Sequence, residues 1–240
     1  MRENRKSIGD AVYSTLYKNI INMTLLPGTI MSEKDISARM EVSRTPVREA
    51  FIKLSKDGLV YIVPQKGTIV SKIDMKRVEE ERFLREILEC GVLELFMKCK
   101  TEDSIYKMKK NLEKQKDALE KKEYDKFMEY DNMFHKITFD ETNKNMCWNI
   151  IENASGHYYR IRLITAWMED ISINVIEQHQ ELIDRIVDND YESAKKILKH
   201  HIRKIIIEED EVFEKYPEYF KAIDDDNIFG DNLFSDLKNK

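Results

Sequence analysis

The chain has 240 residues, of which 35% are charged, with only 7 glycines, 4 prolines and a formal net charge of −5. This length is enough for two domains, and so few glycines and prolines favour a mainly helical globular protein over a fibrous or disordered one. The sequence has no run of 18 apolar residues and no apolar signal-peptide core near its start, so we expect a cytoplasmic protein without a membrane span. Cys90, Cys99 and Cys147 show no pairing pattern, which is typical of reduced thiols.

Two amphipathic segments open the chain. Residues 8–22 carry apolar side chains at helical spacing, namely Val12, Leu16, Ile20 and Ile21. Leu26-Pro-Gly28 then has the chemistry of a turn. Ser32 is suited to cap a short second helix, whose buried stripe is formed by Ile36 and Met40.

The next helix begins near Ser43, which is suited to cap it, and Pro46 lies in its first turn, where a missing N–H has no cost. Arg44 and Arg48 are four residues apart and therefore project from the same side. A second face is apolar and can anchor the helix: Val47, Phe51 and Leu54. The two short helices and the turn at residues 40–43 predict a helix-turn-helix, in which such arginines suit a DNA major groove. Two arginines alone would more often mark a solvated helix face.

A predicted hairpin follows the recognition helix. The β-branched runs 59–63 and 68–70 surround a Pro/Gly turn, with Gln65 and Lys66 at the tip and Gly67 allowing close backbone approach. Such a wing is suited to phosphate or minor-groove contact. The charges agree, because residues 1–75 hold 12 Lys/Arg against 8 Asp/Glu, whereas the remainder holds 28 against 37. The half with the helix-turn-helix is thus the basic half, as phosphate binding requires.

These motifs resemble the winged-helix domain of the GntR family of bacterial regulators over about residues 8–72. The resemblance rests on Leu26-Pro-Gly28, Ser32-Glu-Lys-Asp-Ile36, Ser43-Arg-Thr-Pro-Val-Arg-Glu-Ala50, Asp57-Gly-Leu59 and Lys66-Gly67. It implies contact of the recognition helix and the wing with double-stranded operator DNA. The candidate DNA-binding residues are Lys34, Ser43, Arg44, Thr45, Arg48, Gln65, Lys66 and Gly67. Many relatives carry Arg at the position of Lys34, and Lys keeps the charge but lacks the bidentate fork.

From Asp74 onward the sequence predicts helices only. Amphipathic stretches separated by short breaks cover about residues 75–98, 103–121, 123–140, 145–166, 172–188 and 191–214. Short connections imply antiparallel neighbours, hence an all-α bundle of about six helices. We therefore expect a mainly α protein with a winged helix-turn-helix domain at 1–74, a helical metal- and effector-binding domain at 75–215 and an acidic tail at 216–240.

Four side chains in this bundle form a candidate metal site. Asp131 and His135 are four residues apart on one helix face. His179 lies about nine residues before the turn at 188–190 and His201 about eleven after it, which places them roughly 14 and 17 Å from the turn and nearly side by side in an antiparallel pair. One carboxylate and three imidazoles suit a divalent transition metal such as Zn²⁺, Ni²⁺, Mn²⁺ or Fe²⁺. Each pair taken alone is also compatible with an ordinary helix surface.

The same residues resemble the metal-binding pattern of the FCD domain, the effector domain of the FadR-type GntR subfamily, over about residues 78–213. The matching segments are Asp131-x-x-Phe-His135, Gln178-His179-x-x-Leu182-Ile183 and His201-Ile202. The resemblance implies that Asp131, His135, His179 and His201 are metal ligands and that a small carboxylate effector fills the open metal positions. Arg85 matches an arginine common in the first helix of that domain; it either meets the effector or pairs with Glu89.

The sequence therefore favours a ligand-responsive regulator that binds a pseudo-palindromic operator as a homodimer and acts as a repressor. Two alternatives remain open. One is a metal-free regulator whose bundle binds an apolar acyl ligand. The other is a metal-dependent hydrolase, although no partner for a general base is evident.

Overall fold

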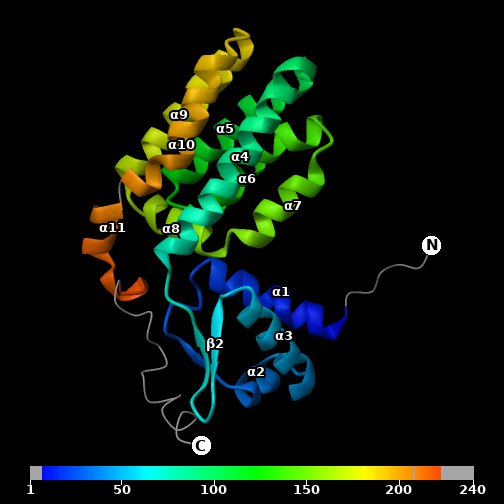
Figure 1. Cartoon of the computed structure of the whole chain (residues 1–240), viewed down its shortest axis with the longest axis vertical. Coiled ribbons are helices and arrows are strands. Elements are labelled where there is room, and N and C mark those ends of the chain that lie inside the picture. The colour runs from blue at the N-terminus through cyan, green and yellow to red at the C-terminus, as the bar shows by residue number, and fades with distance from the viewer. Residues whose placement is uncertain (1–6, 208, 223–240) are drawn as a thin grey trace, which may run out of the picture.

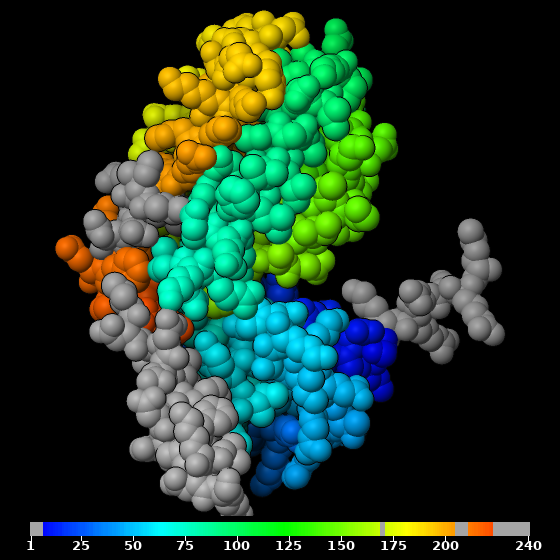
Figure 2. All heavy atoms as spheres, viewed as in Figure 1, coloured from blue at the N-terminus to red at the C-terminus, as the bar shows by residue number. Residues whose placement is uncertain are grey.

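A computed structural model describes residues 7–207 and 209–222 and shows a winged-helix part below a larger helical part (Figure 1). The chain is mainly helical with one small sheet, as predicted from its composition and periodicity. The space-filling view shows the blue-to-cyan winged-helix part directly against the green-to-orange helical part (Figure 2). Within the described residues, no helix is long and apolar enough to cross a membrane.

The N-terminal part is a winged helix-turn-helix. In chain order its elements are α1 Ile8–Ile21, β1 Ile30–Met31, α2 Glu33–Arg39, α3 Arg44–Lys56, β2 Val60–Val63 and β3 Gly67–Val70. The three strands form one antiparallel sheet in the order β1-β3-β2. α1 packs against α3 through a shared apolar core that includes Val12, Leu16, Ile20, Val47, Phe51 and Leu54. The helical spacing of these residues in the sequence therefore marks the buried faces.

Three details of this part differ from the sequence analysis. The two-residue strand β1 was not predicted; it pairs Ile30 with Ile69 across the sheet. The side chain of Ser43 stands at the N-cap of α3 but makes no capping hydrogen bond. Ile36 and Met40 are only half-buried, because α2 lies at the edge of the core.

The helical part consists of a bundle followed by a C-terminal segment, residues 209–219, which is called the strap below. Its elements are α4 Met75–Cys99, α5 Glu102–Glu120, α6 Tyr124–Glu141, α7 Asn145–Ala154, α8 Gly156–Ala166, α9 Glu169–Val187, α10 Tyr191–Ile207, α11 Glu209–Lys215 and the 3-10 turn η1 Pro217–Tyr219. α5 lies along α6, and α9 lies along α10, as the short connections predicted (Figure 1). The strap returns to the junction of the two parts, where Ile73 N–H donates to the Tyr219 carbonyl at 2.8 Å. The predicted tail beyond residue 222 lies outside the described residues.

The helix expected over 145–166 is in fact two helices, α7 and α8, which meet at Ser155. Gly156 begins α8 in contact with the winged-helix part, and a Cβ there would lie 2.7 Å from the Cδ2 atom of Leu59. The break thus lets α8 start directly against the DNA-binding half of the chain. Periodicity did not reveal it, because the apolar spacing continues through both helices.

α8 connects the two parts by hydrogen bonds. The Nε2 atom of His157 lies 3.2 Å from the Gly58 carbonyl, and its Nδ1 atom accepts the Asp74 N–H at 3.0 Å. The guanidinium of Arg160 donates to the Ser71 carbonyl at 2.6 Å. Burial lowers the pKa of His157 to about 2, with Arg160 adding to the effect, so its ring is neutral and holds both contacts as one tautomer.

Candidate metal centre and nucleic-acid interface

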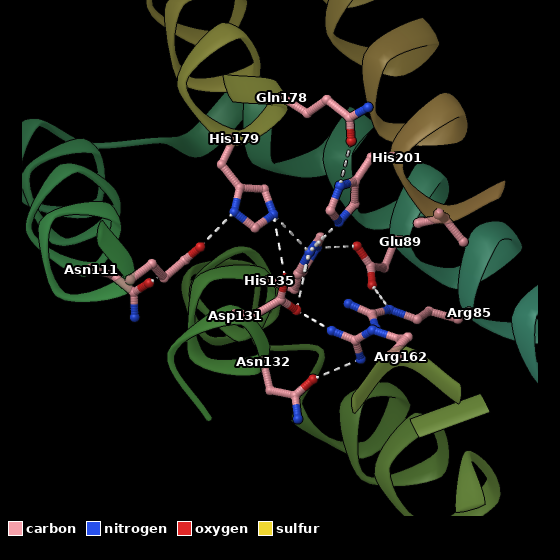
Figure 3. Close-up of polar contacts among 12 residues, drawn as sticks. Arg85, Glu89, Asn111, Asp131, Asn132, His135, Arg162, Gln178, His179 and His201 are labelled. Atoms are coloured by element: carbon pink, nitrogen blue, oxygen red, sulfur yellow. Dashed lines mark hydrogen bonds and ion pairs between the residues drawn. The ribbon is translucent and has the colours of Figure 1, made fainter. Parts of the chain in front are cut away.

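The four predicted ligands converge in the middle of the bundle (Figure 3). Asp131 and His135 come from α6, His179 from α9 and His201 from α10, and one ligand atom from each lies within 4.8 Å of the others. The Nε2 atom of His135 is 3.2 Å from that of His201 and 3.3 Å from that of His179. The Asp131 carboxylate oxygens lie 3.9 and 3.7 Å from the Nε2 atoms of His135 and His179.

Hydrogen bonds to the Nδ1 atoms fix the orientation of the three imidazole rings. The Nδ1 atom of His135 lies 2.6 Å from Glu89, and that of His201 lies 3.0 Å from Gln178 Oε1 (Figure 3). The Nδ1 atom of His179 lies 2.8 Å from Gln115 Oε1. The amide of Gln115 is itself oriented, because its nitrogen donates to Asn111 at 2.8 Å. All three acceptors are oxygens, so each ring carries its proton on Nδ1 and leaves Nε2 as a lone-pair donor.

Three converging lone pairs repel one another unless a cation lies between them. Metal–nitrogen distances near 2.1 Å imply N···N separations of about 3.4 Å in a tetrahedron and about 3.0 Å between adjacent positions of an octahedron. The observed separations of 3.2 and 3.3 Å fall between these values. The donor set therefore fits a divalent transition metal, and outer hydrogen bonds of this kind are typical of metal-ligating histidines.

The protonation states also suit a metal. Burial lowers the pKa of His179 to about 4 and holds those of His135 and His201 well below their usual range. Burial alone would raise the pKa of Asp131, but Arg162 and the neighbouring imidazoles and Arg85 together hold it below its usual range. Near neutral pH the site thus offers three neutral imidazoles and one carboxylate, which are the metal-binding forms.

Two arginines lie beside these ligands. Arg162 of α8 donates to the Asp131 carboxylate and to Asn132 Oδ1, the latter at 3.0 Å. Arg85 of α4 is buried and pairs with Glu89 in the same helix, the second of the two roles expected for it. Its Nη2 atom has no hydrogen-bond partner among the described residues, so one guanidinium donor stays available for another acceptor. The Cζ atoms of Arg85 and Arg162 lie 5.8 and 5.6 Å from the centroid of the Tyr158 ring, so the two guanidinium groups share this neighbour.

Part of this centre was not predicted from the sequence. Glu89 carried a weak signal, because it lies four residues after Arg85 on one helix face. Gln115 carried none, since a polar residue on a charged amphipathic helix is normally solvent-facing, whereas here it is fully buried. Arg160 does not line the site but belongs to the junction described above.

The candidate DNA-binding residues lie on α2, α3 and the wing. Seven of them are exposed, namely Lys34, Ser43, Arg44, Thr45, Arg48, Gln65 and Lys66, and Gly67 is half-buried. Arg48 donates two hydrogen bonds to Glu33 of α2, at 2.8 and 2.9 Å. This fork orients Arg48, and DNA contact requires the arginine to leave or share that partner. Gln65 at the wing tip has a φ of 64°.

Gly67 has a structural reason to be glycine. Its φ is 108°, and a Cβ at this position would lie 2.7 Å from the Met31 carbonyl oxygen of β1. The backbone that closely approaches Gly67 is therefore that of the neighbouring strand β1. Contact of the wing with DNA stays a separate prediction. Gly67 supports the wing through the sheet.

Comparisons with known proteins agree with this geometry. Residues 8–70 match "Bacterial regulatory proteins, gntR family", and residues 82–204 match the "FCD domain". The chain belongs to the GntR family and carries an FCD domain. It is 33% identical over 198 residues to the HTH-type transcriptional repressor RspR of Escherichia coli, covering 82% of this chain and 87% of that protein. It is 28% identical to the gluconate operon transcriptional repressor of Bacillus subtilis, over 78% and 79% of the two chains.

Solved structures show the same fold. E. coli McbR/YncC has a TM-score of 0.70 at 20% identity, covering 88% of this chain and 99% of that one. A putative GntR regulator from Rhodococcus has a TM-score of 0.69 at 21% identity, covering 87% and 98%. The matched families and relatives regulate transcription, so the resemblance drawn from the sequence is confirmed and the chain is a transcription regulator rather than a hydrolase.

Proposed function

We propose that this protein is a repressor that binds operator DNA as a dimer and senses a small carboxylate at a metal site in its FCD domain. The function is divided along the chain, with DNA binding in residues 1–74 and sensing in 75–215. The observation that carries the proposal is the convergence of three Nε2 lone pairs and one carboxylate oxygen within 4.8 Å in a buried position. Repression is inferred from two relatives that are named repressors.

In this proposal four residues hold the metal: Asp131, His135, His179 and His201. The hydrogen bonds to Glu89, Gln115 and Gln178 keep the imidazole rings oriented. A bound divalent metal supplies open coordination positions for carboxylate oxygens. Arg85 contributes the guanidinium donor that has no partner, and Arg162 shares its charge between Asp131 and the acid. A small cavity of about 40 Å³ beside Asp131, Arg162 and His201 supports access of such an acid to the ligands.

On the DNA side, Arg44 and Arg48 enter the major groove from the start of α3, and the wing residues Gln65 and Lys66 contact the backbone. All four side chains are exposed. Lys34, Ser43 and Thr45 flank the same end of the helix-turn-helix. The dimer can hold its two winged helices in more than one relative placement, and only one of them fits the operator. An acid shifts the equilibrium between DNA-bound and free protein only if it binds one placement more tightly than another.

Two pairs of variants test the proposal. His201→Ala is expected to lower bound metal in elemental analysis to well under one equivalent, whereas His200→Ala, on an exposed neighbouring residue, is expected to leave it unchanged. Arg48→Ala is expected to abolish operator binding in fluorescence anisotropy, whereas the exposed Lys107→Ala removes a charge from α5 without effect. Wild-type protein that neither contains nor takes up metal would refute the metal site and favour the metal-free acyl-ligand alternative.

A further inference from the structure

A cleft between the two parts of the molecule reaches the two arginines, and its lining residues lie outside α9 and α10. It has a volume of about 780 Å³, within the usual range for sites that bind small molecules. Its walls come from α1, α4, α6, α7 and α8, and the residues that matter here are Tyr17, Ile21, Arg85, Trp148, Tyr159 and Arg162. α1 belongs to the winged helix and lies beneath α7 at the junction (Figure 1).

Two residues that line this cleft each carry a buried donor without an acceptor. Arg85 is 2% exposed and Trp148 is 1% exposed, yet Arg85 Nη2 and Trp148 Nε1 have no hydrogen-bond partner among the described residues. Buried N–H groups are almost always paired in folded proteins, because an unpaired one loses its hydration without compensation. Two such donors in residues of one cleft favour a ligand whose acceptor atoms reach them when it binds.

The charges at the cleft favour an anion at its inner end. The charged rim residues are balanced, with Lys18, Lys126 and Lys136 against Asp125, Glu129 and Glu152. The inner end, next to the metal centre, instead presents Arg85 and Arg162, which pair with Glu89 and Asp131. A metal held by Asp131 takes up the carboxylate charge that now offsets Arg162, which leaves the inner end positive.

The rest of the cleft suits an apolar or aromatic body. Tyr17 of α1 and Tyr159 of α8 are half-buried aromatic walls, and Ile21, Trp148 and Ile151 are buried behind them. Aromatic walls with one polar end are typical of sites for amphipathic small molecules.

We propose that this cleft binds an amphipathic organic acid, with its carboxylate at Arg85 and Arg162 and its apolar body against α1, α7 and α8. The inference rests on the proposed function for the acid but places most of the ligand outside the metal centre. Such a ligand touches the sensor and the winged-helix part at once, because Tyr17 and Ile21 are part of α1. Its binding therefore favours one placement of the winged helix directly.

The test uses full-length, metal-loaded protein and 1-pyrenebutyrate as the probe, with 1-pyrenebutanol as its neutral match. Pyrene anisotropy reports binding. We expect the acid to bind at least roughly tenfold more tightly than the alcohol, because the alcohol leaves the arginine donors without an anionic partner. In Trp167→Phe protein, Trp148 is the remaining one of 2 tryptophans, and its emission should fall as the probe binds.

Cleft-filling variants locate the probe. Lys18→Trp on α1 and Met133→Trp on α6 place a large ring at exposed positions on the cleft wall and should weaken probe binding at least roughly tenfold. Ile173→Trp makes a similar change at an exposed position of α9, outside the cleft, and should alter binding by no more than about twofold.

Metal content and operator affinity measured on the same samples separate the two proposals. If the wild-type protein does not bind metal, or does not bind the operator, the proposed function is wrong. If both persist while the cleft variants bind the probe as well as the wild type, the cleft proposal is wrong. It is also wrong if Lys18→Trp and Met133→Trp convert a dimer to monomer in analytical ultracentrifugation, because the cleft is then an interface between copies of the chain.

Discussion

Glu81, at the junction of the two parts, is predicted to make the stability of the folded protein depend on pH. Its Oε2 atom accepts the N–H groups of His157 and Tyr158, each at 2.8 Å, and so caps the first turn of α8. The charged groups that face it are Arg77, 3.5 Å from Oε1, and Arg160. Burial nevertheless dominates these favourable contacts and raises the pKa of Glu81 from 4.5 to about 7. The ionised carboxylate is therefore disfavoured in the folded protein.

The sign of the pH effect follows from proton binding. Between pH 4.5 and about 7 the folded protein holds a proton on Glu81 that the unfolded chain has lost. The stabilising contribution of Glu81 is thus complete below pH 4.5 and disappears as the pH rises through about 7. At roughly 1.4 kcal/mol for each pH unit, the loss amounts to an upper limit of about 3 kcal/mol.

Glu81→Gln keeps an acceptor for the α8 N–H groups but removes the titration. We expect the free energy of unfolding of this variant, relative to wild type, to rise by up to about 3 kcal/mol between pH 4.5 and 8. Urea unfolding of metal-free protein at a series of pH values measures this difference without a contribution from metal binding. A relative stability that is flat or falls over this range would refute the reasoning.

Glu79→Gln is the matched control on the same helix. Its hydrogen bond from Arg82 lowers the pKa of Glu79 below the ordinary value, so the wild-type carboxylate contributes stability above that value and loses it as the pH falls. Glu79→Gln should therefore lose stability relative to wild type as the pH rises towards 4.5 and stay nearly constant between pH 4.5 and 8. Half of the Glu79 side chain is exposed, so solvent screening keeps this effect small.

Three further predictions concern the metal centre, the wing and the recognition helix. Gln115→Leu removes the acceptor of one ligand imidazole and should weaken metal binding roughly 10- to 100-fold in a competition titration with a chelator, whereas retained affinity would rule out an orienting role. Gly67→Ala should lower the melting temperature more than Gly28→Ala, because both have positive φ but only Gly67 would place a Cβ against backbone; equal losses would show that φ alone matters. Glu33→Gln frees Arg48 for phosphate and should tighten binding to non-specific DNA and steepen its salt dependence by about one unit of log–log slope, which anisotropy at several salt concentrations measures.

The predictable parts of the fold are those with a local signal. The helical spacing of Val12, Leu16 and Ile20 marks the buried face of α1, and the β-branched runs around residues 64–67 mark the hairpin. β1 has no such signal, because two residues become a strand only by pairing with β3, which is distant in sequence. The break at Ser155 likewise depends on contact with Leu59, almost a hundred positions earlier.

The candidate site likewise has a part with a local signal in the sequence and a part without one. Asp131 and His135 share a helix face by local geometry, and the heights of His179 and His201 follow from one short turn. Glu89 and Gln115 come from α4 and α5, and their approach to the rings depends on how those helices pack. Arg85 illustrates the limit most clearly, since its pairing with Glu89 was one of two readings and its free Nη2 atom can be seen only in three dimensions.

We propose that α8 carries events at the candidate metal centre to the winged helix. Tyr158 and Arg162, four residues apart, face the sensor, where Tyr158 donates to the Ile202 carbonyl at 2.9 Å and Arg162 holds Asp131. His157 and Arg160, three residues apart, face the winged-helix part. The two pairs occupy different faces of one rigid helix and are separated along its axis by less than about 8 Å. A ligand that takes Arg162 away from Asp131 changes the forces on the same helix that holds the wing domain by hydrogen bonds. Because those bonds end on backbone groups, a small rotation of α8 is transmitted to the backbone that enters and leaves the wing.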